Sequence, residues 1–287
     1  RSGLLLSGIA CSAGVNAASP YENGLLVPWA TYDSASQSTA VGLMTCAAGT
    51  VYWTFYNANG AAVSNGSISM DANDMESFIW ASEGSGLGGT DGYMTFSLDT
   101  DGDTSIDSGD TNCLQGNAFY LDLTNNDVKF IPTVPLSDSD YSFGSGEDLE
   151  NMGDTTIANL SNAVTSSVIF PSVVDMRYYV DGSSGGKDTT IVVWSTGDVS
   201  ATFSTTVYDD DGNSDSMNLT MSQSHLNLID PESLSLPSGY TDGFIAWTTS
   251  SDVISFSVVE DNSIGAAQTL INPDRAGSVW IPPIIDI

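Results

Sequence analysis

Oxygen-bearing side chains recur at a regular spacing between residues 99 and 110. Carboxylates occupy the first, third, fifth, ninth and twelfth positions of this run, and a backbone carbonyl is available at the seventh; in order, the residues are Asp99, Asp101, Asp103, Asp107, Asp110 and, for the carbonyl, Ser105. Calcium takes about six to eight oxygen ligands in a flexible geometry. Because clustered carboxylates repel one another unless a cation neutralises them, the spacing predicts a calcium site. The alternative is a solvated acidic loop between two strands.

The run resembles the calcium loops of EF-hands and, more closely, of dockerin-type repeats, which also end in Asp. The resemblance covers residues 99–110 only, and it implies a Ca²⁺ cofactor held by the residues named above. Two positions depart from the EF-hand pattern, since Thr104 stands where a glycine makes the sharp turn and Asp110 where a longer Glu binds bidentately. No second copy of the loop follows, so the cohesin-binding role of dockerins is not carried over.

The composition excludes several classes of function. The 287 residues include 5 Lys plus Arg against 36 Asp plus Glu, which gives a formal net charge of −31. Nucleic acids and anionic membranes attract basic surfaces, so neither is an expected partner. His225 is the single histidine, and with so few cationic side chains the common catalytic bases and oxyanion clamps are scarce. We therefore expect a protein that is not an enzyme.

The first segment has the features of an export signal. Residues 1–17 combine the basic Arg1, an apolar run around Leu4–Leu6 and small residues before Ala18. We interpret them as a truncated signal peptide cleaved after Ala17, and no later stretch is apolar for long enough to span a bilayer. The expected location is therefore secreted, either extracellular or on the cell surface.

The cysteine count agrees with export. Removing Cys11 with the signal leaves Cys46 and Cys113, and a secreted chain permits one disulfide between them. Two unpaired buried thiols remain the alternative.

Short runs rich in β-branched and aromatic residues recur every 8–12 residues, separated by Gly, Asn, Asp and Ser. This pattern is typical of an antiparallel sandwich or barrel. The halves also resemble each other: Phe55–Gly60 parallels Val207–Gly212, and Thr90–Met94 parallels Thr241–Ile245, at a nearly constant offset of about 151 residues. The sequence thus predicts an all-β chain of two tandem Ig-like β-sandwich domains, with the calcium loop in the first.

The expected domain boundaries follow from this repeat. The first sandwich spans residues 18–136 and the second 164–287, joined by a polar linker over 137–163 in which a short helix is possible near 155–164. The acidic stretch Asp209–Asp215 falls where the repeat predicts a hairpin turn, with a weak second calcium site as the alternative.

The remaining candidates are weaker. We expect His225 to be a surface or loop residue. Most of the six tryptophans lie inside strand patterns, where core packing is the ordinary role; they are Trp29, Trp53, Trp80, Trp194, Trp247 and Trp280. The apolar segment 279–287 is a last strand or a contact to a neighbouring subunit.

These features resemble exported bacterial proteins with duplicated Ig-like sandwiches. The leading interpretation is a secreted, calcium-binding structural or cell-surface protein, such as an adhesin or a self-associating subunit of an extracellular layer or filament. The alternative is a pair of carbohydrate-binding modules, in which exposed aromatic rings would stack on a glycan.

Overall fold

The computed structural model describes residues 21–32, 36–79, 90–124, 127–160, 173–180, 186–196, 202–248, 253–261 and 266–270. In these residues strands dominate, and the only helical elements are two single 3₁₀ turns, η1 (Asp138–Asp140) and η2 (Pro231–Ser233). None of the described residues forms a helix long and apolar enough to span a membrane. The expected signal segment 1–17 and the apolar segment 279–287 lie outside the described residues.

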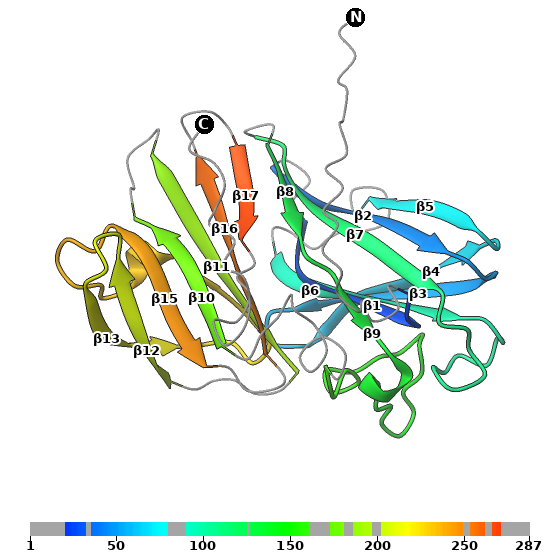
Figure 1. Ribbon diagram of the computed structural model, residues 1–287. Coiled ribbons are helices and arrows are strands. Elements are labelled where there is room, and N and C mark those ends of the chain that lie inside the picture. The colour runs from blue at the N-terminus through cyan, green and yellow to red at the C-terminus, as the bar shows by residue number, and fades with distance from the viewer. Residues whose placement is uncertain are drawn as a thin grey trace, which may run out of the picture.

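The N-terminal half forms two antiparallel sheets packed face to face (Figure 1). Sheet I has the order β4-β3-β6-β1-β9 and sheet II the order β5-β2-β7-β8. The strand bounds are β1 Gly24–Tyr32, β2 Gln37–Thr45, β3 Gly49–Asn57, β4 Ala62–Met70, β5 Asp74–Ile79, β6 Thr90–Asp99, β7 Leu114–Asp122, β8 Asp127–Ile131 and β9 Val134–Leu136. Aromatic rings from the two sheets pack together between them: the ring centroid of Phe78 lies 5.3 Å from that of Phe96 and 5.2 Å from that of Trp53.

The C-terminal half forms two further antiparallel sheets. Sheet III has the order β10-β15-β12-β13 and sheet IV the order β14-β11-β16-β17. The strand bounds are β10 Val173–Tyr179, β11 Lys187–Ser195, β12 Thr202–Asp209, β13 Ser214–Thr220, β14 Leu226–Ile229, β15 Asp242–Thr248, β16 Val253–Asp261 and β17 Ala266–Leu270. The fold class expected from the sequence, an all-β antiparallel sandwich, is confirmed.

The strand order of the second half repeats that of the first. If the strands β1 to β8 are matched in sequence order with β10 to β17, the strand order of sheet I becomes that of sheet III and the order of sheet II becomes that of sheet IV. Sheet I has β9 as an additional edge strand. The turns match as well: Gly60 (φ 89°) donates its N–H to the Asn57 carbonyl, and Gly212 (φ 84°) donates to Asp209. The stretch from Asp209 therefore forms a hairpin turn, as the repeat predicts.

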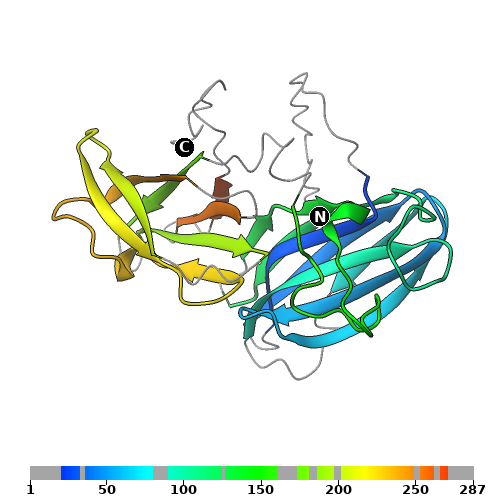
Figure 2. The ribbon, with the colours of Figure 1, turned by 90° about the horizontal axis from the view of Figure 1, so that it is seen from below.

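Sheet IV is buried on both of its faces. Successive side chains of a strand point to opposite faces, so Ile191 and Val193 pack in the core shared with sheet III, while Val192 and Trp194 belong to the core of the N-terminal half. Figure 2 shows the two halves side by side. The uninterrupted apolar run at the end of β11 has this physical origin, because a strand covered on both faces has no solvent-facing positions.

The segment 137–160 differs from the polar linker expected for it. Its scattered apolar side chains are buried in the core of the N-terminal half; these are Tyr141, Leu149, Met152, Ile157 and Leu160. Tyr141 Oη lies 2.8 Å from Ser97 Oγ, and the Asn65 side-chain amide donates to the Glu150 carbonyl at 2.6 Å. The segment thus covers the outer face of sheet I, and residues 155–160 contain no helix.

Candidate metal centre

The acidic loop lies where the chain crosses from sheet I to sheet II, between β6 and β7. Asp99, the last residue of β6, is only 2 % exposed. Its Oδ1 accepts hydrogen bonds from the N–H groups of Gly102 at 2.6 Å and Asp101 at 3.2 Å, and its Oδ2 accepts one from Thr104 at 3.0 Å. Asp99 therefore holds the first turn of the loop closed.

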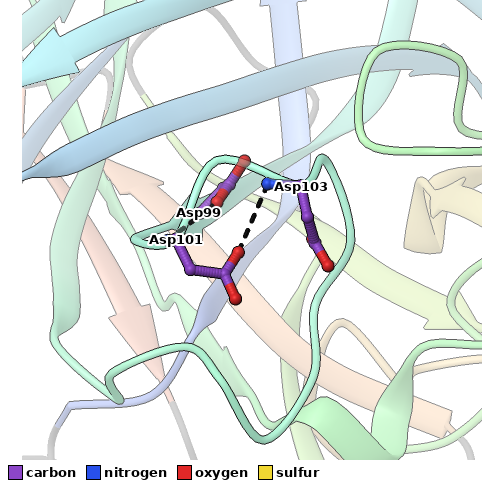
Figure 3. Close-up of side chains that lie close together, drawn as sticks. All are labelled: Asp99, Asp101 and Asp103. Atoms are coloured by element: carbon purple, nitrogen blue, oxygen red, sulfur yellow. Dashed lines mark hydrogen bonds between the residues drawn. The ribbon is translucent and has the colours of Figure 1, made fainter.

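Three of the expected ligands converge. One carboxylate oxygen from each of Asp99, Asp101 and Asp103 lies within 4.8 Å of the other two (Figure 3). Asp101 and Asp103 are exposed, and the N–H of Asp103 donates to Asp101 Oδ1 at 3.3 Å. Three carboxylate oxygens at this spacing suit a hard divalent cation, which prefers anionic oxygen ligands.

The remaining expected ligands have different roles. Asp110 closes the loop, because its Oδ1 accepts from the Thr100 N–H at 2.7 Å and its Oδ2 from the Asp107 N–H at 3.2 Å. Asp107 lies near the cluster, because a Cβ added at Gly109 would touch Asp101 Oδ2 and lie 3.0 Å from Asp107 Oδ1. The N–H of Ser105 donates to Asp103 Oδ1 at 2.8 Å. The structure thus gathers the first three carboxylates and places Asp107 beside them.

The charges of the loop act on Asp101. Reduced hydration of its carboxylate raises its pKa above the ordinary value; the hydrogen bond from the Asp103 N–H partly opposes this change, and repulsion from the carboxylates of Asp103, Asp110 and Asp107 adds to it. A bound cation would reverse this repulsion, because opposite charge favours the ionised form of a carboxylate.

Contacts outside the loop hold it in place. Ile106 is buried in the core of the N-terminal half, and the N–H of Leu149 donates to the Thr104 carbonyl at 2.9 Å. The disulfide between Cys46 and Cys113, with a Cα separation of 5.3 Å, joins the end of β2 to the residue before β7. The sequence pattern did not predict the contact between Leu149 and the loop, because nothing in the local sequence around Leu149 indicates a hydrogen bond to Thr104, 45 residues earlier.

The backbone at Thr104 takes the place of a glycine. Thr104 has φ 65°, in the left-handed region, and Gly102 has φ 85°. Thr104, at the sixth position of the loop, therefore makes the same backbone turn that a glycine makes in EF-hands. Only its side chain departs from the EF-hand pattern.

His225 lies in the loop before β14, one of the two positions expected for it, but it is buried and not on the surface. It is 4 % exposed, and its Nδ1 lies 2.9 Å from the Ser195 carbonyl. Its ring centroid is 5.7 Å from that of Tyr93 and 6.3 Å from that of Trp194. His225 is thus part of the contact between the two halves of the chain.

Comparisons with known proteins reveal only distant likenesses. No family model and no curated protein matches the chain. Among solved structures, it is similar to FlgD from P. aeruginosa (20 % identity, 37 % of this chain and 78 % of that one, TM-score 0.24). It is also similar to oxalate decarboxylase from Bacillus subtilis (9 % identity, 87 % and 68 %, TM-score 0.20) and to the apo form of a Pleurotus ostreatus lectin (11 % identity, 93 % and 82 %, TM-score 0.20). Likenesses this low carry no functional argument.

Proposed function

We propose that the chain is a secreted, calcium-stabilised structural or cell-surface protein without enzymatic activity. The observation that carries the proposal is the convergence of Asp99, Asp101 and Asp103 within 4.8 Å, in a loop with EF-hand-like spacing. Asp107 lies near them, and the proposed ligand set adds the Ser105 carbonyl at the seventh position of the loop. The cation neutralises their repulsion and joins the end of β6 to the start of β7.

Extracellular conditions suit this arrangement. The Cys46–Cys113 disulfide sits at the base of the loop, and disulfides persist in oxidising compartments. A site with the shorter Asp110 in place of a bidentate Glu would bind calcium weakly, and weak sites are typical of extracellular modules. The disulfide and calcium would then stabilise the same corner of the sandwich.

Calcium dependence of thermal unfolding tests the proposal. At a calcium concentration about 100-fold above Kd, binding adds about 2.7 kcal/mol to the free energy of unfolding, which raises Tm by roughly 4–5 °C for a chain of 287 residues. Asp101→Asn/Asp103→Asn removes two ligand charges and spares Asp99, whose hydrogen bonds the loop needs. We expect this variant to lose the calcium response while remaining folded in chelator.

The matched control is Asp127→Asn/Glu232→Gln. It removes the same charge from β8 and η2, outside both the loop and the β12–β13 turn, so its Tm should rise with calcium as in the parent protein. An equal response in all three proteins would mean that calcium acts through general screening of the acidic surface, and the site proposal would fail.

The described side chains favour this role over a carbohydrate-binding one. A glycan platform needs exposed, coplanar rings, whereas Trp29, Trp53 and Trp194 are at most 5 % exposed. The exposed rings of Phe119 and Phe130 meet at an interplanar angle of 68°, which does not form a flat surface. Trp80, Trp280 and the side chain of Trp247 lie outside the described part of the chain.

A further inference from the structure

The contact between the two halves joins unlike surfaces. The outer face of sheet IV, here called face IV, supplies apolar side chains to the core of the N-terminal half: Val192, Trp194, Leu226, Ile254, Phe256 and Val258. Face IV covers one end of that half, here called tip N and formed by Tyr56, Tyr93 and the turn 57–60. The ring centroids of Trp194 and Tyr93 are 5.4 Å apart, and the Ala58 carbonyl accepts from the Leu226 N–H at 3.0 Å.

The repeat places an equivalent of face IV on sheet II, and it is exposed. In sheet II, Thr45 pairs with Leu114, and at the same place in sheet IV, Ser195 pairs with Val253. Counting along the strands from these two pairs gives, for each residue of sheet IV, the equivalent residue of sheet II. Three exposed side chains of sheet II then correspond to Trp194, Leu226 and Val258 of face IV; they are Met44, Met75 and Phe119, at 40 %, 70 % and 37 % exposure. The other three apolar residues of face IV correspond to Gly42, Gln115 and Asn117, so sheet II is apolar at three of these six positions. We call this surface face II.

The repeat also places an equivalent of tip N at the C-terminal half. Tyr56 and Tyr93 stack with centroids 4.7 Å apart, and their equivalents Tyr208 and Phe244 stack at 4.5 Å. Tyr56 and Tyr93 are 1 % and 2 % exposed, whereas Tyr208 and Phe244 are only partly buried. Tyr208, Phe244 and the turn 209–212 therefore form a second tip, tip C.

We propose that face II of one copy docks on tip C of a second copy, repeating between molecules the contact that face IV makes with tip N inside each molecule. The partner is another copy of this chain because it carries an equivalent of each surface of the internal contact: tip C keeps the stacked ring pair, and face II keeps three of the six apolar positions. Because face II and tip C are different surfaces of each copy, a docked pair still offers one face II and one tip C to further copies, so chains add head to tail. This inference deepens the proposed structural function by naming its assembly surface.

Charge controls the docking. The turn of tip N reads Asn57-Ala58-Asn59, whereas that of tip C reads Asp209-Asp210-Asp211. The residue before Leu226 in face IV is His225, and its equivalent before Met75 is Asp74. Carboxylates thus face each other across the proposed contact, whereas the equivalent positions of the internal contact carry no carboxylate. Since salt screens exposed charges over about 8–10 Å at physiological ionic strength, assembly should require salt.

The first experiment gives tip C the turn of tip N. We expect the parent protein to be monomeric at low sodium chloride and to grow in mass as sodium chloride and protein concentration rise. The variant Asp209→Asn/Asp210→Ala/Asp211→Asn should assemble at low salt, with a weight-average mass at least about twofold above that of the parent in sedimentation velocity. A variant that stays monomeric at every salt concentration would overturn the proposal.

The second experiment tests whether the contact joins unlike surfaces. In the turn-swapped background, Met75→Asp blocks face II and Phe244→Ser damages tip C. Each protein alone should remain monomeric, while an equimolar mixture should form a heterodimer that grows no further, because only one intact face and one intact tip are present. Val63→Asp, which charges a side chain that is 46 % exposed on β4 outside face II, is the matched control and should still assemble.

Other outcomes have definite meanings. Self-association of the Phe244→Ser protein alone would show a contact of face II with itself, and unchanged assembly of Met75→Asp would show a different surface; either result overturns the proposal. If Phe244→Ser does not fold, Met75→Asp against Val63→Asp still decides the role of face II. The calcium site is tested separately, since Met75→Asp should keep its calcium-dependent Tm and Asp101→Asn/Asp103→Asn should still assemble in sodium chloride.

Discussion

At the scale of single residues, Thr104 combines a β-branched side chain with a left-handed backbone conformation. A left-handed backbone disfavours residues with a Cβ by about 1–2 kcal/mol, and β-branched residues are the least suited to it. Thr104 nevertheless adopts φ 65°, and three interactions keep it there: its N–H donates to Asp99, its carbonyl accepts from Leu149, and its hydroxyl donates to the Asp103 carbonyl at 2.6 Å. The loop geometry therefore outweighs the preference of the residue.

Replacing Thr104 by Asn should stabilise the protein. Asn tolerates the left-handed region, as Asn73 does at φ 62°, so Thr104→Asn should raise the free energy of unfolding by about 0.5–1 kcal/mol after the loss of the hydroxyl hydrogen bond. Urea unfolding in chelator measures this change without calcium. Thr111→Asn, at an exposed position with ordinary φ, should leave the midpoint unchanged; a lower midpoint for Thr104→Asn would contradict the argument.

At the scale of elements, the disulfide and the acidic loop act on the same connection. Cys113 lies between the loop and β7, and its partner Cys46 follows β2, 67 residues earlier in the sequence. The N–H of Cys46 also donates to the Cys113 carbonyl at 3.3 Å. Closing a loop of this length lowers the entropy of the unfolded chain, which stabilises the folded protein by about 2–4 kcal/mol in typical cases.

Removing the disulfide should therefore weaken both stability and metal binding. We expect Cys46→Ser/Cys113→Ser to lose about 2–4 kcal/mol of unfolding free energy and to need more calcium for half of the maximal rise in Tm, because the loop is no longer anchored at its base. Urea unfolding and calcium titration followed by Tm measure the two effects. A reductant should shift the parent to the same midpoint and leave the variant unchanged; identical midpoints for parent and variant without reductant would refute the prediction.

At the scale of the whole molecule, the second half depends on the first. The side of β16 that faces sheet III includes the buried Ser255 and Ser257, while the opposite side presents Ile254, Phe256 and Val258 to the N-terminal half. Apolar burial is the main stabilising contribution to folding. The C-terminal half therefore obtains much of its apolar burial from the contact with the N-terminal half. The ion pair between Lys129 and Glu260 adds a link between the edges of the two halves.

The two halves should accordingly behave differently when separated. We expect a fragment of residues 18–163, which keeps the disulfide and the segment over sheet I, to unfold cooperatively. A fragment of residues 164–287 should lack a cooperative transition and expose the apolar face IV, because that face needs its partner surface. Circular dichroism melting and binding of a hydrophobic dye measure both properties. Mixing the fragments should restore the transition, and a cooperative melt of 164–287 alone would contradict this dependence.

Much of the architecture can be predicted from local sequence patterns. Strand segments follow from β-branched and aromatic runs between turn residues, and the common offset of the two halves predicted the matching strand orders because duplicated segments take the same places in a sheet. The spacing of Asp99, Asp101 and Asp103 predicted their convergence, since a tight loop sets neighbouring carboxylates by its own geometry. Such features depend on interactions between residues close in sequence.

Tertiary structure alone decided the features that depend on distant segments. The apolar residues of 137–160, such as Tyr141 and Leu149, show no regular period, and only the uncovered face of sheet I explains why they are buried. The same holds for His225, whose burial comes from Tyr93 and Trp194, and for the second covered face of sheet IV. A sheet has two faces, and the sequence of its strands indicates which of them are apolar. It does not indicate which distant part of the chain covers each apolar face.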